Sequence, residues 1–420
     1  MRNDCYPGAP SEWSKLPVSA LAKQNPRYRV EKGKEYPFVE MSSIAENFGG
    51  ILKYDTRKLE GSGLARFKEQ DTLFAKITPC PENGKIAFVE KLPAETGLGS
   101  TEFLVLSPLS ETDPKFLYHL LCSQPVRGRA VSRMEGSTGR QRVPDDVFDR
   151  RLLVPVPKHE EQCAIARFLD ALDEAIAHRR NAAEKAKELR HALLQEMMPP
   201  WVGFKQLDMD RMPSHVESIP LASDVCDIKN GATPSRIEGR YWRNGTIPWL
   251  PTGKVNERRI TYANQHVTDV ALRECSIQLI PSGSVLVGMI GQGKTRGLSA
   301  YLMIDACINQ NFGAFTPKRR VVGNWLFHYF DFHYSRLREI GGGTNQGALN
   351  CYLLKRLRLP LPSMDSQKEA ARVLDTAEEL ERSHIGVLEQ FEKLKRALMH
   401  VLFTGNVRID PKLFKEEAFA

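Results

Sequence analysis

The sequence has few of the patterns that mark metal sites, disulfide frameworks or membrane spans. Its eight cysteines are scattered and no two are close together, so neither a Cys-x-x-Cys pair nor zinc-finger spacing occurs. Its ten histidines form no His-Glu-x-x-His motif. No stretch approaches the roughly 18 uncharged apolar residues that a membrane span needs, and the first residues do not resemble a secretory signal peptide. We therefore expect reduced thiols, no bound metal and a cytoplasmic location.

Motifs for catalysis are also scarce. Residues 288–295 fit the phosphate-binding pattern Gly-x-x-x-x-Gly-Lys-Ser/Thr, but Gly297 and a strand-like run follow where a helix would have to begin. We interpret this segment as the tip of a β-hairpin. Cys80 follows a proline, as the nucleophile of cytosine methyltransferases does, but no glycine-rich cofactor loop precedes it. Neither a catalytic triad nor an adenine-methylating Asn-Pro-Pro-Tyr motif stands out, so the sequence gives no positive indication of catalysis.

The length of the chain indicates the number of domains, and its net charge indicates the class of partner. At roughly 100–200 residues per domain, 420 residues indicate two or three domains. The 59 Lys and Arg residues exceed the 51 Asp and Glu residues and give a net charge of +8. This excess favours a polyanionic partner, with nucleic acid first, although a basic surface without a role is the alternative.

The two halves of the chain match each other. Pro155, Gln162, Arg167 and Asp170 reappear in the same order and spacing, and their counterparts are Pro360, Gln367, Arg372 and Asp375. Earlier blocks also match in order: residues 83–85 with 292–294, 101–103 with 310–312, and 116–119 with 325–328. Each match is weak alone, but their common order indicates that one unit was used twice.

Each copy predicts a β-rich part, a short helical patch, a Gly/Ser/Thr loop, a last strand ending in Pro-x-Pro, and a long helix. Apolar residues in the long helices recur with the 3.5-residue period of a coiled coil, which requires a helical partner. Core helices within separate domains are the alternative. We predict an apolar seam formed by Ile165, Leu169, Leu172 and Ile176 in the first helix and by Val373, Leu380, Val387, Phe391, Leu394 and Leu398 in the second.

Polar and basic loops relieved by glycine also occur in both copies. Arg and Lys can bond guanine, Asn and Gln can bond adenine, and Ser and Thr can bond phosphates. A solvated turn is the alternative for any single residue. The candidate DNA-binding residues are Lys76, Asn83, Lys85, Ser137, Thr138, Arg140 and Arg142 in the first copy, and Tyr241, Trp242, Lys254, Gln292, Lys294, Thr295, Arg296, Thr344, Asn345 and Gln346 in the second.

These features predict two DNA-reading heads held apart by paired helices. A helix of about 37 residues spans roughly 55 Å, which could cover up to about 16 base pairs. The sequence resembles the specificity subunit of type I restriction-modification systems. The resemblance covers about residues 10–405 and rests on the duplicated Pro-x-Pro…Gln…Leu-Asp runs at 155–170 and 360–375, on Gly231-x-Thr233-Pro234, on Tyr241-Trp242, on 247–249 and on the run 342–350.

The resemblance implies an α+β fold, in which two α/β target-recognition domains form a tandem pseudo-twofold repeat separated by two long antiparallel coiled-coil helices. The first half lacks the Gly-x-Thr-Pro and Tyr-Trp patterns, so the DNA bases that the first domain would read are less defined. The implied boundaries are 1–158 for the first recognition domain, 159–199 for the central spacer helix, 200–217 for a linker, 218–362 for the second recognition domain, 363–404 for the distal spacer helix and 405–420 for a tail.

The resemblance also implies a non-catalytic subunit of the prokaryotic cytoplasm. Each domain would read one half of a bipartite, asymmetric site in double-stranded DNA. The chain would recruit two modification (methyltransferase) subunits and restriction (translocase/nuclease) subunits. S-adenosylmethionine, ATP and Mg are expected in those partners, and no cofactor is expected in this chain. A stand-alone DNA methyltransferase or nuclease is the alternative, as is a helical scaffold without a DNA role.

Overall fold

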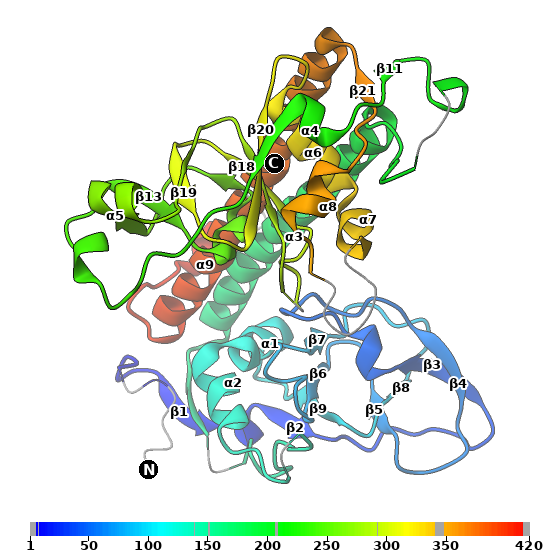
Figure 1. The fold of residues 1–420 in the computed structure, drawn as a ribbon. Helices are drawn as coiled ribbons and strands as arrows, with labels where there is room; N and C mark the ends of the chain where they lie inside the picture. The colour runs from blue at the N-terminus through cyan, green and yellow to red at the C-terminus, as the bar shows by residue number, and fades with distance from the viewer. Residues whose placement is uncertain are drawn as a thin grey trace. The chain divides into compact units, whose positions relative to one another are not determined.

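The computed structural model describes residues 6, 8–137, 139–149, 152–205, 209–291, 293–340 and 348–414. The chain folds into two compact units that are not contiguous in sequence. Unit 1 comprises Met1–Asn181 and Gly386–Ala420, and unit 2 comprises Ala182–Ile385. Two long helices, α3 (His159–Met197) and α9 (Met364–Phe403), run through both units (Figure 1). Each unit therefore contains a part of each long helix.

The described residues of unit 1 form two four-stranded sheets and one two-stranded pairing. The first sheet is antiparallel and runs β2 (Ala22–Gln24), β9 (Phe103–Pro108), β6 (Thr72–Ala75), β7 (Ile86–Phe88). The second runs β4 (Asp55–Lys58), β3 (Glu35–Val39), β8 (Gly97–Gly99), β5 (Ala65–Phe67), with β3 parallel to β8. Before α3, β10 (Leu153–Val156) pairs with β1 (Ser14–Pro17).

The helices of unit 1 follow from local sequence. Asp113 caps α1 (Pro114–Cys122) by accepting a hydrogen bond from the backbone N–H of Phe116, and proline occupies the first helical position. Apolar side chains let α1 pack on β6, β7 and β9 (Figure 1). The described part of this unit also contains α2 (Gln124–Val131) and the 3₁₀ turns η1 (Val18–Ala20), η2 (Met41–Ser43) and η6 (Pro411–Phe414).

Unit 2 repeats this arrangement with one strand added. One sheet runs β12 (Cys226–Lys229), β20 (Phe312–Pro317), β17 (Val285–Gly288), β18 (Ser299–Leu302), β14 (Arg259–Ile260). The other runs β15 (Gln265–Val267), β13 (Ile247–Leu250), β19 (Ala306–Ile308), β16 (Leu279–Ile280), with β13 parallel to β19. Before α9, β21 (Leu361–Pro362) pairs with β11 (Val216–Ser218).

Helix α6 (Gly323–Phe332) packs on β17 and β18, as α1 does on their counterparts. The other helices of unit 2 are α4 (Ala222–Val225), α5 (Asp269–Glu274), α7 (Tyr334–Glu339), α8 (Cys351–Lys355), η3 (Met209–Arg211), η4 (Gly239–Tyr241) and η5 (Thr252–Glu257). The matching strand orders confirm the predicted α+β repeat. The segment that fits the phosphate-binding pattern joins the antiparallel strands β17 and β18, so it is the predicted hairpin.

The seam of α9 lies one residue further along the helix than predicted. Leu380 and Leu394 are 42% and 48% exposed, so the prediction that they line the seam is wrong. In unit 2, Leu374 belongs to the buried cluster that includes Leu194 of α3. In unit 1, Leu402 belongs to the cluster that includes Leu169. Of the other predicted seam residues, Ile165, Leu169 and Ile176 are buried, whereas Leu172, Val373, Val387, Phe391 and Leu398 are half-buried.

Charged residues explain this displacement. Glu381 follows Leu380 and pairs with Arg190 of α3 at 2.6 Å, and Lys395 follows Leu394 and pairs with Asp173. A heptad pattern that counts apolar residues alone does not recognise a seam that contains ion pairs. It selects instead the neighbouring row of apolar residues, which includes Leu380 and Leu394. Within the described residues, no helix combines the length and the apolar character that crossing a membrane would demand.

Candidate nucleic-acid interface

A buried glutamine holds each long helix to the strands and helix that precede it. Gln162 accepts a hydrogen bond from the backbone N–H of Asp113, next to α1, at 3.0 Å and donates one to the carbonyl of Pro157 at 3.0 Å. Gln367 makes the equivalent bonds, accepting from the N–H of Val322 at 3.0 Å and donating to the second proline of its Pro-x-Pro at 2.9 Å. The matched glutamines of the sequence repeat therefore form matched joints.

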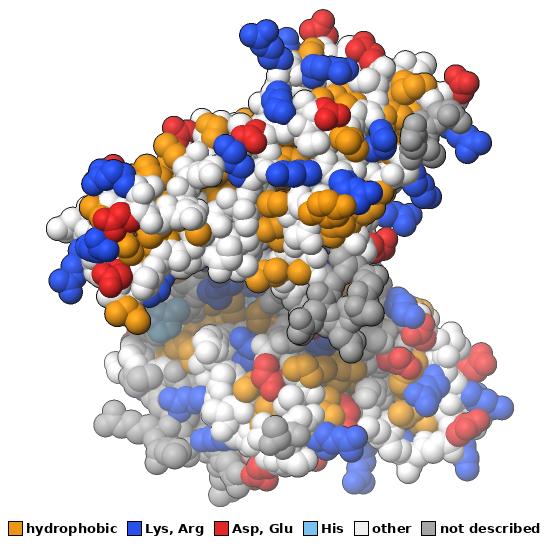
Figure 2. All heavy atoms as spheres, in the orientation of Figure 1, with side chains coloured by type: hydrophobic (Ala, Val, Ile, Leu, Met, Phe, Trp, Pro, Cys, Tyr) orange, Lys and Arg blue, Asp and Glu red, His pale blue; other side chains and the backbone are white. Residues whose placement is uncertain are grey.

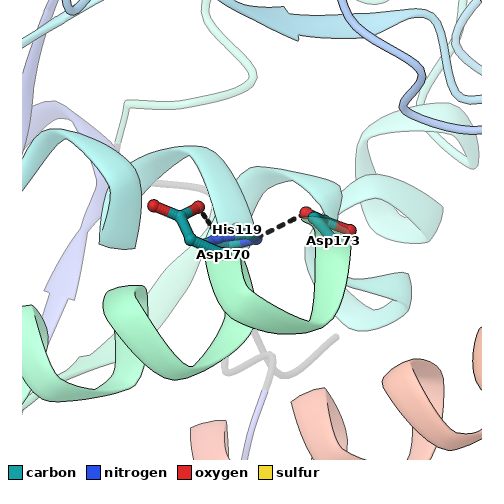
Figure 3. A group of neighbouring side chains, drawn as sticks. All are labelled: His119, Asp170 and Asp173. Carbon is teal, nitrogen blue, oxygen red and sulfur yellow. Dashed lines mark hydrogen bonds and ion pairs between the residues drawn. The ribbon is translucent and has the colours of Figure 1, made fainter. Parts of the chain in front are cut away.

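A histidine forms a second joint in unit 1. Figure 3 shows His119 of α1 between Asp170 and Asp173 of α3. Its Nε2 lies 2.9 Å from Asp170 Oδ1, and its Nδ1 lies 3.8 Å from Asp173 Oδ2. The ring is completely buried. Burial lowers the pKa of His119 and outweighs the two carboxylates, so the neutral ring donates from Nε2 to Asp170.

Unit 2 repeats this joint. His328 of α6 is completely buried, and its Nε2 lies 2.8 Å from Asp375 Oδ1 of α9. Glu378 stands where Asp173 stands in the first copy, and its carboxylate lies 2.7 Å from the guanidinium of Arg259. Burial would raise the pKa of Asp375, but the hydrogen bond from His328 and the charge of Arg259 hold it below its usual range.

Each His–carboxylate trio has spacing that a metal ion could use. In each trio, however, a cation already contacts the carboxylates: Lys395 in unit 1 and Arg259 in unit 2. A divalent ion would have to displace that cation. We therefore assign the trios a structural role, in which they tie α1 to α3 and α6 to α9. The sequence carried a signal for them, because both histidines and both aspartates fall in the matched blocks of the repeat.

The predicted DNA-binding residues of unit 1 separate into two groups. Lys76 and Arg142 come together around one acidic residue: Lys76 donates its backbone N–H to the carbonyl of Glu102, and Arg142 binds the Glu102 carboxylate in a bidentate pair at 2.8 and 2.9 Å. Asn83 and Lys85 lie elsewhere, bonded to Glu46 and to the carbonyl of Met41 respectively. Ser137 and Arg140 are exposed, and Thr138 lies outside the described residues.

A polar hollow of about 460 Å³ opens beside Lys76. Two further cations line it, Arg27 and Arg66, together with Asn25 and Thr101. Arg66 donates to the carbonyl of Tyr28 at 2.8 Å, and Arg27 is exposed. Cations beside amide and hydroxyl groups can bind phosphates and base edges. These residues were not predicted from the sequence, because they lie in separate loops and in strand β5 and only the fold brings them together.

In unit 2, Lys294 best fits the predicted role. It is exposed at the hairpin tip between β17 and β18, and its backbone carbonyl accepts a hydrogen bond from Tyr334 of α7 at 2.8 Å. Thr295 and Arg296 of the same tip are half-buried. The tip is therefore braced, while the exposed Lys294 side chain can reach a base edge or a phosphate. Gln292, Thr344, Asn345 and Gln346 lie outside the described residues.

Other predicted residues of unit 2 serve the fold. Lys254 is only 5% exposed, its Nζ lies 2.7 Å from Glu257, and it covers the ring of Tyr262. This burial contradicts its assignment as a DNA contact, because a phosphate could not reach its ammonium group without displacing both neighbours. Tyr241 is 9% exposed and donates its hydroxyl to Glu274, so it belongs to the core rather than to an interface.

Trp242 is half-buried against Trp249, and the part of its ring that stays exposed offers an aromatic platform. Its indole N–H donates to the carbonyl of Ser235 at 2.9 Å, and the guanidinium of Arg236 lies 3.8 Å from its ring centroid. Gly231 precedes this platform at a point where a Cβ atom would lie 1.7 Å from the carbonyl oxygen of Ile308. Only glycine allows that approach, which explains the glycine of the Gly-x-Thr-Pro motif.

The surface charge agrees with separate contact sites on each unit. On the face drawn in Figure 2, lysine and arginine side chains are interspersed with acidic and neutral ones rather than gathered in one region. The candidate contacts are thus local: the hollow beside Lys76 in unit 1, and the hairpin tip with the Trp242 platform in unit 2.

Comparison with known proteins identifies this architecture. The family described as "Type I restriction modification DNA specificity domain" matches twice, over residues 19–185 and 214–390. The chain belongs to this family and carries two DNA specificity domains.

Among curated proteins, it is 22% identical over 392 residues to the putative type I restriction enzyme MjaX specificity subunit of Methanocaldococcus jannaschii, covering 89% of this chain and 88% of that one. It is 23% identical to the EcoR124I/EcoR124II specificity subunit of Escherichia coli, with 64% of each chain covered. The stand-alone methyltransferase or nuclease alternative is not favoured, since these relatives are named as specificity subunits.

Solved structures show the same fold. The type I restriction-modification system S subunit from M. genitalium aligns with a TM-score of 0.58 at 16% identity, covering 93% of this chain and 96% of that one. A chain from a study of complex assembly and conformational transition of the type I R-M system aligns with a TM-score of 0.56 at 20% identity, covering 95% and 99%. At such identities these structures support the fold alone.

Proposed function

We propose that this chain is the non-catalytic specificity subunit of a type I restriction-modification complex. Each recognition region reads one half of a bipartite, asymmetric site in double-stranded DNA, and the long helices set the number of unread base pairs between the halves. The observation that carries this proposal is the duplication itself: two DNA specificity domains, each fixed to its own long helix by the same glutamine and histidine joints.

The partners are two modification subunits that methylate DNA, joined by restriction subunits that translocate and cleave it. In this proposal, S-adenosylmethionine, ATP and Mg are bound by those partners in the prokaryotic cytoplasm. The exposed apolar residues of α9 support protein partners, because Leu380 in unit 2 and Leu394 in unit 1 present large side chains to solvent. Exposed apolar side chains on a helix are typical of interaction surfaces.

Co-expression of this chain with its cognate modification subunit tests the proposal. Sequencing the methylated genome of the host should reveal one gapped motif that is absent without this chain. Lys294→Ala should relax the sequence requirement in one half of that motif, and Lys393→Gln, on the exposed side of α9, serves as the matched control. Absence of gapped methylation, despite a stable complex with the modification subunit, would overturn the proposal.

A further inference from the structure

Each unit has a space between a short helix, α1 in unit 1 and α6 in unit 2, and the long helices. The two units differ in what fills this space. In unit 2 an ion network fills it. Arg258 forms a bidentate pair with Asp331 of α6 at 2.6 and 2.9 Å, and also reaches Glu378 of α9 at 3.0 Å. Arg190 of α3 joins Asp331 at 3.1 Å and Glu381 at 2.6 Å.

The corresponding positions of unit 1 cannot form this network. Asn47 follows the last paired residue of β3 by the same number of residues as Arg258 follows the last residue of β13. We therefore treat Asn47 as the counterpart of Arg258. Both have positive φ, 53° and 61°. Cys122 follows His119 as Asp331 follows His328. Both members of the Arg258–Asp331 pair are therefore replaced by uncharged residues in the first copy.

A cavity of about 520 Å³ occupies this place in unit 1. Ile176 of α3 stands where unit 2 has Glu381, and it forms an apolar wall with Phe48 and Met399. Burial raises the pKa of the Cys122 thiol to about 12, so this wall residue stays neutral. The volume lies within the range of about 300–1,000 Å³ that small-molecule sites occupy, and mainly apolar walls are typical of them.

The polar groups of the cavity are predominantly cationic. Lys395 and Arg180 are held by the two acidic residues of the lining, Asp173 and Glu392. Arg127 donates to the carbonyls of Pro81 and Glu82, at 3.0 and 2.8 Å, through one Nη only.

Among the described residues, none accepts a hydrogen bond from its buried Nε. Burial also lowers the pKa of Arg127, because its partners do not fully replace the lost hydration. A half-buried guanidinium at the wall of a cavity, with part of its hydrogen-bonding capacity unused, favours an anionic acceptor in that cavity.

We propose that this cavity binds a small amphipathic anion: an aromatic or aliphatic body against Ile176, Phe48 and Met399, and a carboxylate, sulfonate or phosphate group against Arg127 and Arg396. Such a ligand bridges α2, α3 and α9 within unit 1. It takes the place that Arg258 and its partners take in unit 2, and so fastens the first recognition region to the long helices. The cavity shares no lining residue with the polar hollow beside Lys76.

Titration of the full chain with anilinonaphthalene sulfonate tests the site without DNA. This probe has about 21 non-hydrogen atoms and should bind with a dissociation constant in the tens of micromolar, as ordinary ligand efficiency gives. Binding should shift the ¹³C-methyl NMR signal of Met399, assigned through Met399→Leu. The proposal would be overturned if the probe did not bind, or if it bound and left the Met399 signal unmoved.

Two variants sharpen the test. Asn47→Arg with Cys122→Asp rebuilds the ion pair of unit 2 inside the cavity and should weaken probe binding by tenfold or more. Arg127→Gln keeps the cavity open, removes the half-buried guanidinium from its wall, and should weaken binding roughly tenfold. Lys393→Gln on the exposed side of α9 should leave binding unchanged. If Arg127→Gln and the folded double variant both bound the probe as tightly as the wild type, the assignment would be wrong.

Discussion

The Arg258–Asp331 pair in unit 2 allows a quantitative test of how a recognition region is held to its long helices. Both side chains are largely buried, with Asp331 16% and Arg258 32% exposed. Burial would raise the pKa of Asp331, but the hydrogen bond and charge of Arg258, with Arg190, hold it below its usual range. Removing one partner of a buried pair costs about 3–5 kcal/mol. Because these groups retain some contact with water, we expect Asp331→Ala to cost about 2–3 kcal/mol.

Replacing both partners should cost much less. In Arg258→Met/Asp331→Leu, Glu378 keeps its pair with Arg259, and Arg190 keeps its pair with Glu381, so no charge is left buried alone. Apolar replacement of a whole buried pair is often close to neutral, and we expect a loss below about 1 kcal/mol. Arg258→Met alone should fall between these values, and the deviation from additivity measures the coupling.

Urea denaturation followed by tryptophan fluorescence provides the assay, because four of the five tryptophans lie in unit 2. Asp331→Ala should lower the midpoint by about 1 M, at a slope of about 2–3 kcal/mol/M. Glu369→Ala serves as the control, since it breaks an exposed pair and should cost less than about 0.5 kcal/mol. Equal destabilisation by Asp331→Ala and by the double replacement would refute the reasoning.

Three other perturbations test the remaining parts of the structure. Lys76→Ala should weaken binding of DNA and reduce the slope of log affinity against log salt by about 1, as loss of one phosphate contact does; a salt titration of binding checks it. Leu380→Asp should leave the free energy of unfolding within about 0.5 kcal/mol of wild type, because the side chain is exposed, yet weaken co-purification with a modification subunit. Burial lowers the pKa of His119, so the unfolded chain binds the proton more readily. Stability of unit 1 should fall as pH drops below the unfolded pKa of about 6.5. His119→Gln should flatten that dependence, measured by hydrogen exchange of α1 amides.

The repeat and the long helices could be predicted from the sequence because their signals are local. The Pro-x-Pro runs disfavour helix immediately before α3 and α9, and the apolar period extends over the whole of each helix. The observed bounds, His159–Met197 and Met364–Phe403, lie within two residues of the predicted 159–199 and 363–404. The matched glutamines could also be recognised, because each has the same spacing from its Pro-x-Pro run. Each bonds to a proline carbonyl a few residues away and to one backbone N–H further back in the chain.

The details of the site depend on distant residues and could not be predicted. Lys254 looks like a surface cation in a glycine loop, and nothing local shows that Glu257 and Tyr262 enclose it. The cations Arg27 and Arg66 line the hollow beside Lys76, Arg27 from the loop after β2 and Arg66 from strand β5. Spacing along the chain does not reveal such a grouping, because it arises only when the two sheets of unit 1 fold together.

The comparison of the two copies separates what a recognition region must keep from what it is free to change. Both keep the buried glutamine and the histidine–aspartate joint, with Gln162 and His119 in one copy and Gln367 and His328 in the other. They differ at the exposed contact sites. A chain that reads an asymmetric site needs two unlike readers held in one frame. The joints supply the common frame because they are buried and depend on exact hydrogen-bond geometry, whereas exposed loops can change at a cost of about 0.5 kcal/mol or less. Exchanging the exposed loops between the copies should therefore exchange the half-sites while leaving both joints intact.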